Sequence, residues 1–365
     1  MPKDSKDSII LKDHKIKDQL LQVMIDNEWS DMYITVWTHP WIKIGWEILR
    51  IDEWIEAFNA EDTELFAKSV ITEEQHERLI ETRNLDFSFS FGGRRFRWNV
   101  SFQMNNYMVV LRLLTWKVPN IDDLNLPDIF KEVCKVGQWL ILVTWPTGSG
   151  KSTTLAAMID YINANYKKHV ITIEDPIEYI HEHKQSIMEH KEIWRDIPNY
   201  NIALKGAMRQ NPQVILFGEM RDREEIEMAL TLAETGHVVF STLHTKSASQ
   251  TISRVIDSFP AANQNQIRLG LADSLVAVFS QRLLRTQDWT WVRMVKEILV
   301  NNWAIANLIR ENDIFQIPSI MQMWAREWMQ LLESDIIELV VSGKISEEEW
   351  LKYANNPKLV KEWLN

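Results

Sequence analysis

The run Trp-Pro-Thr-Gly-Ser-Gly-Lys-Ser-Thr at residues 145–153 constrains the fold of this chain more than any other feature. Its end matches the phosphate-binding loop, written G-x-x-x-x-G-K-[ST]. In such a loop successive backbone N–H groups and the positive end of the following helix bind phosphates. We expect Lys151 to reach the β- and γ-phosphates and Ser152 to hold Mg2+. The predicted ATP and Mg2+ site comprises Thr147, Gly148, Ser149, Gly150, Lys151, Ser152 and Thr153.

The residues on either side support this interpretation. Residues 139–144 form a short apolar run, as expected for a strand buried on both faces. After the loop, Leu155, Met158, Ile159 and Ile162 recur at the spacing of one helix face. A chance Gly-Ser-Gly-Lys in a linker would lack this order of strand, loop and helix.

The first loop position, normally glycine, is Trp145. Its ring either crowds the loop or points outward and leaves the N–H groups in place. The chain has 17 Trp and only 11 Gly, whereas glycine alone averages roughly 7 % of residues. Several of the tryptophans stand where glycine would be expected, namely Trp29, Trp46, Trp289 and Trp291. This composition indicates either an altered sequence or an aromatic-rich surface for partners.

Length and composition limit the possible classes of protein. A chain of 365 residues suits two domains. The formal charge of −11 argues against a general nucleic-acid binder. The single Cys134 cannot form an intrachain disulfide or a four-cysteine zinc site, so we expect no zinc and a reducing compartment. Neither a signal peptide nor a run of 18 apolar residues is found, so we expect a cytoplasmic protein.

The pattern of elements predicts two domains and a linker. Residues 1–115 mix short strands and helices, and the strands expected there are 32–36, 87–91 and 109–114. Residues 116–127 carry two prolines with several Asp and Asn, typical of a linker. From residue 128 helices alternate with apolar strands, which predicts an α/β fold with a parallel sheet. The last hundred residues read mostly as helix. The expected strands of the sheet are 139–144, 169–173, 214–217 and 238–243, and the helices between them include 201–209 and 223–234.

Three polar residues follow these strands, where α/β folds place their active sites. Glu219 follows the third strand, the position of an acid that binds Mg2+ or orients the attacking water. Glu174 follows the second strand and belongs either to a solvated turn or to the site. His244 ends the fourth strand and is either structural or a sensor of the γ-phosphate.

A cluster of arginines lies in the first domain. Arg94, Arg95, Arg97 and Arg112 are either solvated strand residues or include an arginine finger. Such a finger stabilises transition-state charge and is worth roughly 10³–10⁵ in rate.

Five motifs in a fixed order carry a resemblance to a known family. They are Arg95–Asn99, the phosphate loop with its following helix, Thr172–Glu178, Gly218–Asp222, and Ala233–His237 with Thr242–Thr245. Together they resemble the R-F-R-x-N strand, Walker A, Asp box, Walker B and His box of the secretion ATPase superfamily. The match is to the twitching ATPases of type IV pili, the PilT and PilU group, and covers nearly the whole chain.

The resemblance implies a fold and an assembly. It implies an N-terminal PAS-like α+β domain over residues 1–115 and a RecA-like P-loop domain with C-terminal helices over residues 128–365. It also implies a homohexamer that works with related pilus ATPases. Hydrolysis would drive domain rotation against the inner-membrane platform protein of the pilus. The expected place is therefore cytoplasmic, peripheral at the inner membrane at the base of the pilus.

The resemblance also implies a role for each candidate residue. Lys151 and Ser152 would hold phosphate and Mg2+. Glu219 would act as base or water-orienting residue and as a metal ligand, with Glu174 assisting through Mg2+ or water. His244 would contact the γ-phosphate. Of the four arginines in the first domain, Arg97 and Arg112 would neutralise phosphate charge.

Retraction of the pilus is favoured over its assembly. The sequence shows neither the large extra N-terminal domain nor the four-cysteine zinc site of assembly ATPases. Residues 304–311 are similar to the PilT motif A-I-R-N-L-I-R-E, although Ala306 replaces its first arginine. There are two alternatives. One is a nucleotide-binding but weakly active ring subunit, that is, an accessory like PilU. The other is a pilus-assembly or type II secretion ATPase. A DNA translocase is disfavoured by the negative charge.

The departures from the family pattern are concentrated at glycines. The family usually has glycine where this chain has Trp46, Trp139, Trp194, Trp303 and Trp328. Each could strain a turn or a close approach of helices.

Overall fold

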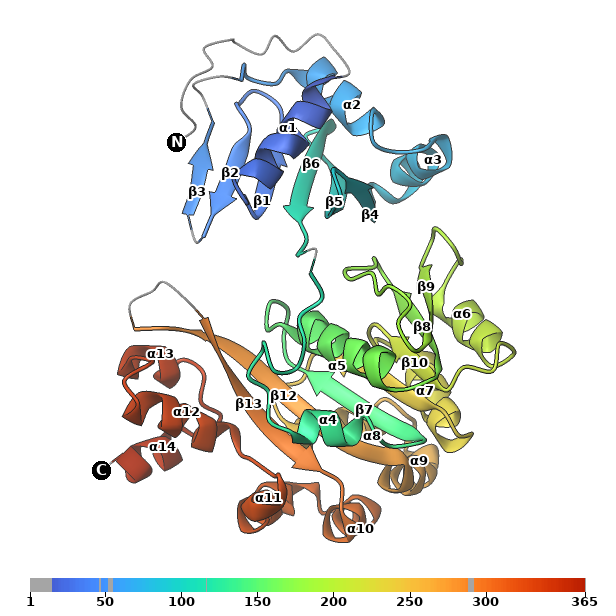
Figure 1. Ribbon diagram of the computed structural model, residues 1–365, viewed down its shortest axis with the longest axis vertical. Coiled ribbons are helices and arrows are strands. Elements are labelled where there is room, and N and C mark those ends of the chain that lie inside the picture. Colours follow the sequence, from blue (N-terminus) through green and yellow to red (C-terminus); the bar gives the residue numbers. More distant parts are fainter. Residues whose placement is uncertain (1–14, 46, 52–54, 116, 288–291, 365) are drawn as a thin grey trace. The chain divides into compact units, whose positions relative to one another are not determined.

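A computed structural model of the chain describes residues 15–45, 47–51, 55–115, 117–287 and 292–364. It divides into two compact units (Figure 1). The first unit comprises residues 1–117 and 175–179, and the second comprises residues 118–174 and 180–365. Three of the tryptophans singled out above, Trp46, Trp289 and Trp291, lie outside the described residues.

The first unit is an antiparallel sheet with helices over one face (Figure 1). Its strand order is β3-β2-β1-β6-β5-β4. The strands are β1 (Asp31–Ile34), β2 (Trp41–Ile44), β3 (Glu47–Arg50), β4 (Asn84–Phe91), β5 (Arg94–Gln103) and β6 (Asn106–Leu113). The helices are α1 (Lys15–Asp26), α2 (Ala60–Lys68) and α3 (Glu73–Thr82).

Local sequence signals account for several of these elements. Helices α2 and α3 both begin with capping boxes, led by Asn59 and Thr72. Strand β5 buries the alternate residues Phe96, Trp98 and Val100 against the helices, as a half-buried strand should. The expected strands near residues 32–36, 87–91 and 109–114 correspond to β1, β4 and β6. Strands β2 and β3 were not predicted, because four-residue strands are too short to show a period.

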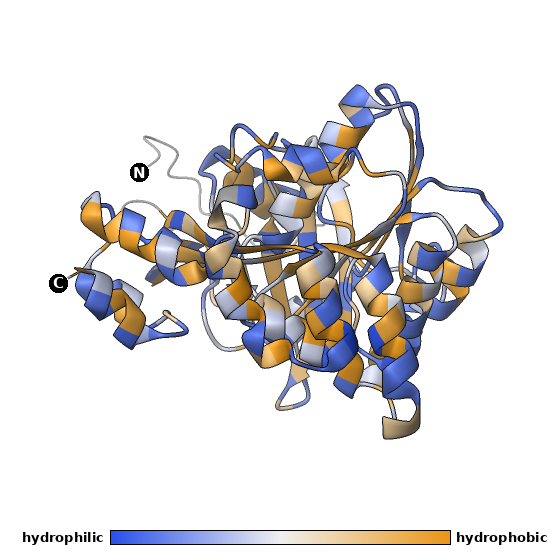
Figure 2. Ribbon diagram, turned by 90° about the horizontal axis from the view of Figure 1, so that it is seen from below, coloured by the Kyte–Doolittle hydropathy of each residue, from blue (hydrophilic) through white to orange (hydrophobic). Residues whose placement is uncertain are grey.

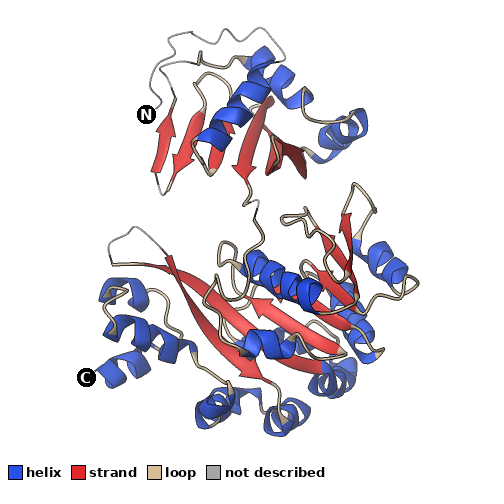
Figure 3. Ribbon diagram, in the orientation of Figure 1, coloured by secondary structure: helices blue, strands red, loops and turns tan. Residues whose placement is uncertain are grey.

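The second unit is built on a seven-stranded sheet (Figure 3). Its order is β13-β12-β7-β11-β10-β8-β9, parallel throughout except for the antiparallel pair β12–β13. The strands are β7 (Trp139–Thr144), β8 (His169–Glu174), β9 (Ile187–Glu192), β10 (Val214–Phe217), β11 (Val238–Leu243), β12 (Leu275–Arg285) and β13 (Val292–Val300).

Helices cover both faces of this sheet, which explains why its strands are continuously apolar. Leu140 and Leu142 of β7 face a core with helices α6 to α11, whereas Ile141 and Val143 face α4 and α5. Figure 2 shows apolar strands between helices of mixed polarity. The helices are α4 (Ile129–Val133), α5 (Lys151–Asn165), α6 (Tyr200–Ala207), α7 (Arg223–Glu234), α8 (Ala248–Asp257), α9 (Ala261–Ser274), α10 (Trp303–Glu311), α11 (Ile317–Met323), α12 (Leu332–Val341), α13 (Glu347–Leu351) and α14 (Pro357–Leu364).

One sequence prediction needs correction. Residues 275–285 and 292–300 are the long strands β12 and β13, not helix, because a short apolar run such as Leu275–Phe279 has no period that distinguishes a buried strand from a buried helix.

Part of the segment predicted as a linker, residues 116–127, packs against the second unit. Ile121 and Leu126 are buried in the core beneath α4 and α5, since turn residues indicate a loop but not whether it packs.

None of the described helices is long and apolar enough to cross a membrane.

Candidate functional site

The phosphate loop joins β7 to α5 and depends on two glycines. Gly148 and Gly150 both have a φ of +82°, and Gly150 caps the N-terminus of α5. A Cβ atom at Gly150 would lie 3.3 Å from Nε2 of Gln281, which is tighter than an ordinary contact. The backbone of the loop thus takes a conformation that these glycines allow, and the positive end of a fifteen-residue helix lies behind it.

Lys151 is folded back over this loop. Its Nζ donates to the carbonyl oxygen of Trp145 at 2.5 Å and to that of Pro146 at 3.4 Å. The ammonium group therefore lies over the turn of the loop with backbone oxygens as partners. Phosphate oxygens of a bound nucleotide can replace these oxygens as acceptors.

A residue that the sequence did not indicate supports the loop from β12. Gln281 is fully buried, and its Nε2 donates to the carbonyl oxygen of Ser149 at 2.9 Å. The neighbouring Ser280 shares a 2.8 Å hydrogen bond with Thr144 at the end of β7. The sequence did not indicate Gln281 because the last hundred residues, which include this strand, were expected to be mostly helix. Among the described residues, Oγ of Ser149 is a buried polar atom without a hydrogen-bond partner.

The side chain of Trp145 packs among the C-terminal helices. It is only 2 % exposed and joins a cluster with Leu284, Leu332 and Trp350. The guanidinium of Arg282 lies 5.7 Å from the centre of its ring. The backbone N–H of Trp145 donates to the carbonyl of Leu243 at 3.2 Å. Of the two orientations considered, the ring has the one directed toward α12 to α14.

Glu219 and His244, which the sequence placed after different strands, meet in the structure. Nε2 of His244 lies 2.7 Å from Oε1 of Glu219, and Nε of Arg221 donates to Oε2 at 2.9 Å. The carboxylate is thus held from both sides and remains partly exposed. The adjacency arises because β10 and β11 are parallel neighbours, with Phe217 opposite Ser241.

The turn that carries Glu219 is tied to its surroundings. Thr242 donates through Oγ1 to the carbonyl of Gly218 at 2.7 Å. Glu225 accepts the backbone N–H of Arg221 at 2.6 Å and completes a capping box with Asp222 at the start of α7. Burial raises the pKa of Glu225 above its ordinary value. Thr242 and Glu225 were not predicted as site residues, although Asp222-x-x-Glu225 is a visible capping signal.

Glu174 ends β8 next to this turn. Strands β8 and β10 pair with Ile173 opposite Phe217, and a Cβ at Gly218 would lie 3.6 Å from the Cα of Glu174. Glycine at residue 218 therefore allows the two strand ends to approach closely. Of the acids predicted from sequence, the structure places Glu174 and Glu219 at the same edge of the sheet.

Arg97 and Arg112 lie directly opposite each other on β5 and β6 of the first unit. Arg97 contacts Asp86 through Nε at 3.1 Å and Nη2 at 2.5 Å, and its Nη1 lies 3.7 Å from Glu178. The hydrogen bond to Asp86 raises the pKa of Arg97. Arg112 donates to Asp31 at 2.7 Å. Carboxylates thus hold both arginines in the first unit, whereas the phosphate loop is in the second.

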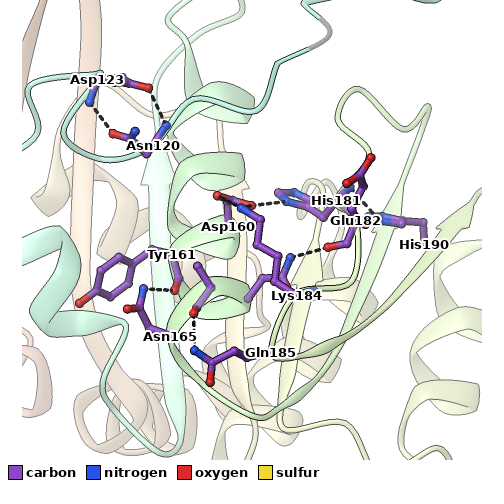
Figure 4. Close-up of polar contacts among 12 residues, drawn as sticks. Asn120, Asp123, Asp160, Tyr161, Asn165, His181, Glu182, Lys184, Gln185 and His190 are labelled. Atoms are coloured by element: carbon purple, nitrogen blue, oxygen red, sulfur yellow. Dashed lines mark hydrogen bonds and ion pairs between the residues drawn. The ribbon is translucent and has the colours of Figure 1, made fainter. Parts of the chain in front are cut away.

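The helix that follows the phosphate loop is anchored at its far end (Figure 4). Lys184 donates to both carboxylate oxygens of Asp160 at 2.7 and 2.8 Å, and Nδ1 of His181 lies 3.8 Å away. Burial alone would raise the pKa of Asp160, but the hydrogen bonds from His181 and Lys184 outweigh it and lower the pKa. The segment between β8 and β9 is thereby attached to α5.

Comparison with known proteins places these features in a family. Residues 78–301 match the type II/IV secretion system protein family. The chain is 40 % identical over 332 residues to the twitching motility protein of Neisseria gonorrhoeae, covering 90 % of this chain and 87 % of that one. It is 40 % identical over 330 residues to the type IV pilus retraction ATPase PilT of Pseudomonas aeruginosa, covering 90 % and 95 %.

A solved structure leads to the same group. The crystal structure of the pilus retraction motor PilT with bound ADP superposes with a TM-score of 0.87 at 41 % identity, covering 94 % of this chain and 98 % of that one. The predicted fold class, an N-terminal α+β domain followed by a P-loop ATPase domain, is confirmed. The chain belongs to the type II/IV secretion system protein family and, within it, to the group of twitching ATPases that includes PilT.

Proposed function

We propose that this chain is a subunit of an ATPase motor that retracts a type IV pilus by hydrolysing ATP. The observation that carries the proposal is the carboxylate of Glu219, held between His244 and Arg221 at the sheet edge that also carries the phosphate loop. The two relatives reported above support it, because one is a twitching motility protein and the other a retraction ATPase.

The phosphate loop would bind the nucleotide through its backbone and Lys151. When ATP enters, Nζ of Lys151 exchanges the carbonyl oxygens of Trp145 and Pro146 for oxygens of the β- and γ-phosphates. The N–H groups at the start of α5 add their positive end. The buried hydroxyl of Ser149 and the neighbouring Thr147 lie in the same loop, and Thr153 lies in the first turn of α5.

The acids would prepare the attacking water. Glu219 would orient the water or accept its proton, and Glu174 at the neighbouring strand end would assist. His244 would leave Glu219 to contact the γ-phosphate. Such an exchange would couple the presence of the γ-phosphate to the freedom of the catalytic carboxylate.

The donor atoms near the loop suit Mg2+. We infer that Ser152 and Glu219 would hold it together with phosphate oxygens. In the described part of the chain, no three His, Cys, Asp or Glu side chains gather as a metal-binding group. Mg2+ commonly uses one or two protein ligands and the substrate's phosphates. The bound ion would neutralise charge that develops on the phosphates.

The first unit would supply positive charge. Arg97 and Arg112, oriented by Asp86 and Asp31, would neutralise the phosphates of a nucleotide. We further propose a homohexamer on the cytoplasmic side of the inner membrane, peripheral at the pilus base. There it would act on the platform protein and together with related pilus ATPases.

Phosphate release by the purified oligomer tests the proposal. Steady hydrolysis that requires Mg2+ and is abolished by Lys151→Ala is the expected result, because the lysine alone supplies the loop's charge. Absence of turnover in the parent protein, with ATP still bound, would instead favour a weakly active accessory subunit. The specific observation behind this second candidate is Trp145, and Trp145→Gly would then restore hydrolysis.

A cell-based test separates retraction from assembly. Deletion of the gene is expected to leave an excess of pili without twitching. Loss of piliation would instead identify a pilus-assembly or type II secretion ATPase.

A further inference from the structure

Among the described residues, five tryptophans have a backbone conformation that suits glycine. They are Trp37, Trp139, Trp145, Trp194 and Trp328, with φ values of 62°, 111°, 150°, 71° and 70°. The Cβ of an L-residue clashes with the backbone at such φ values, and for a bulky residue they are outliers. Glycine adopts them without this clash.

We infer that glycine, not tryptophan, is the native residue at these five positions. The phosphate loop that works in the cell would then begin with glycine at position 145. The inference rests on backbone conformation and does not depend on what the protein hydrolyses.

The anomaly is specific to tryptophan among the aromatic residues. The chain contains 13 Phe and 7 Tyr, and among the described residues none of them has a positive φ. Of the other non-glycine residues at positive φ, the commonest is asparagine, which tolerates the left-handed region. If tertiary packing forced aromatic residues into strained turns, Phe and Tyr would be affected as well.

Burial does not compensate for the strain at three of the positions. The side chains of Trp37, Trp194 and Trp328 are 65 %, 54 % and 51 % exposed. All three lie at turns. Trp37 and Trp194 each donate a 2.7 Å backbone hydrogen bond, to Phe58 and Ile197 respectively. Trp328 ends the 3-10 helix η2 (Ala325–Glu327) in the left-handed conformation, the usual place of a glycine cap.

The other two positions flank the strand that leads into the phosphate loop. Trp139 begins β7 and donates to the carbonyl of His237 at 2.8 Å, and Trp145 follows its end. The carbonyl of Trp145 accepts a hydrogen bond from the ammonium of Lys151, so the backbone at this position determines where the lysine side chain lies. The buried indole also attaches the loop to the C-terminal cluster, a constraint that glycine would remove.

Composition agrees with a systematic replacement. Glycine is scarce, and the 11 Gly and 17 Trp together slightly exceed the share that glycine alone has in an average protein, roughly 7 %. A codon that one genetic code reads as tryptophan and another as glycine would produce this pattern. UGA is such a codon and differs from the glycine codon GGA in its first base only.

Peptide mass spectrometry of the protein isolated from its own cells tests the inference directly. Each tryptophan replaced by glycine lowers the peptide mass by a known amount. We expect glycine at all five positions and UGA at the matching codons of the gene. Peptides with tryptophan at positions 37, 194 and 328 would overturn the inference.

Recombinant protein provides an independent measurement. The triple variant Trp37→Gly, Trp194→Gly, Trp328→Gly is expected to melt roughly 5 °C or more above the parent chain, because relief of left-handed strain at three exposed sites adds up. If the parent does not fold, recovery of a cooperative transition in the variant is the supporting result. An unchanged or lower melting temperature would contradict it.

A matched control uses the same substitution where φ is negative. Trp303 is 75 % exposed and is the first residue of α10. Trp303→Gly also removes an exposed indole but relieves no left-handed backbone strain, so no rise in melting temperature is expected. Trp145→Gly is measured by nucleotide binding instead, because the cavity left by its buried ring opposes the relief of strain. We expect it to bind ATP at least tenfold more tightly than the parent.

Discussion

At the scale of single residues, the function proposed here depends on the carboxylate of Glu219. Nε2 of His244 and Nε of Arg221 approach its two oxygens, so it is oriented before any substrate binds. An oriented acid contributes to catalysis without reorganisation when the water attacks. On the proposed function, ATP would be bound by the phosphate loop, whereas its hydrolysis would use Glu219.

Glu219→Gln tests this separation. Hydrolysis is expected to fall by about 10²–10⁴, the usual contribution of a general base, with ATP binding retained. Phosphate release and binding of a fluorescent nucleotide measure the two effects. The control Glu227→Gln changes an exposed glutamate of α7 and should alter neither. Near-parental turnover in Glu219→Gln would remove this residue from the catalytic group.

A second residue, Glu297 of β13, predicts a pH dependence of stability. Burial raises its pKa to about 7, although its Oε1 accepts the backbone N–H of Ala248 at 2.6 Å. Because the folded state binds the proton more tightly than the unfolded chain, the stabilisation is full below about pH 4.5 and is lost as the pH rises to about 7. The loss amounts to about 3 kcal/mol.

Glu297→Gln keeps an acceptor but cannot ionise. Its free energy of unfolding should therefore fall less than that of the parent between pH 4.5 and 7, the interval from the ordinary pKa of Glu297 to the raised one. Chemical denaturation at a series of pH values measures both. Equal slopes in parent and variant would show that Glu297 does not titrate in this range.

At the scale of elements, the start of α7 fixes the turn that carries Glu219. Asp222 caps the helix, and Glu225 accepts the backbone N–H of Arg221. Asp222→Ala is expected to lower the free energy of unfolding by about 1 kcal/mol. Turnover should fall with it, since the capping box that positions Glu225 against the turn loses one of its two bonds. Asp222→Asn retains the cap and should behave like the parent in both assays.

Strand β12 supports the phosphate loop through Gln281. In Gln281→Leu the buried carbonyl of Ser149 loses its donor, a loss of about 1–3 kcal/mol. We expect ATP affinity to fall by about tenfold, which is about 1.4 kcal/mol. Gln264→Leu removes a comparable bond, from a side-chain amide to the carbonyl of Phe259, and should leave affinity unchanged. Titration calorimetry distinguishes the two variants.

At the scale of the whole molecule, the arginines proposed to neutralise phosphate belong to the first unit, whereas the phosphate loop belongs to the second. Arg112 is held by Asp31 in the first unit, and its side chain is 55 % exposed. If it neutralises phosphate, Arg112→Ala should lower kcat by about 10³ or more. The control is Arg293→Ala, which changes an exposed arginine of β13. Unchanged kcat in Arg112→Ala would assign this arginine a structural role only.

The sequence alone determined what depends on neighbouring residues. Helices α5 and α7 and the parallel strands β7, β8, β10 and β11 follow from apolar runs, helical spacing and the phosphate loop. The order of the motifs indicated the family that the comparisons then established. These features are local because helix spacing and strand burial repeat within a few residues.

The tertiary structure decided what depends on pairing between distant segments. Local spacing could not reveal that β12 and β13 are strands, or that Gln281 reaches a loop 132 positions away. The contact of His244 with Glu219 and the position of Arg97 opposite Arg112 both follow from strand register. The left-handed backbone at Trp37 also became visible only in three dimensions, because φ is set by the turn in which a residue lies.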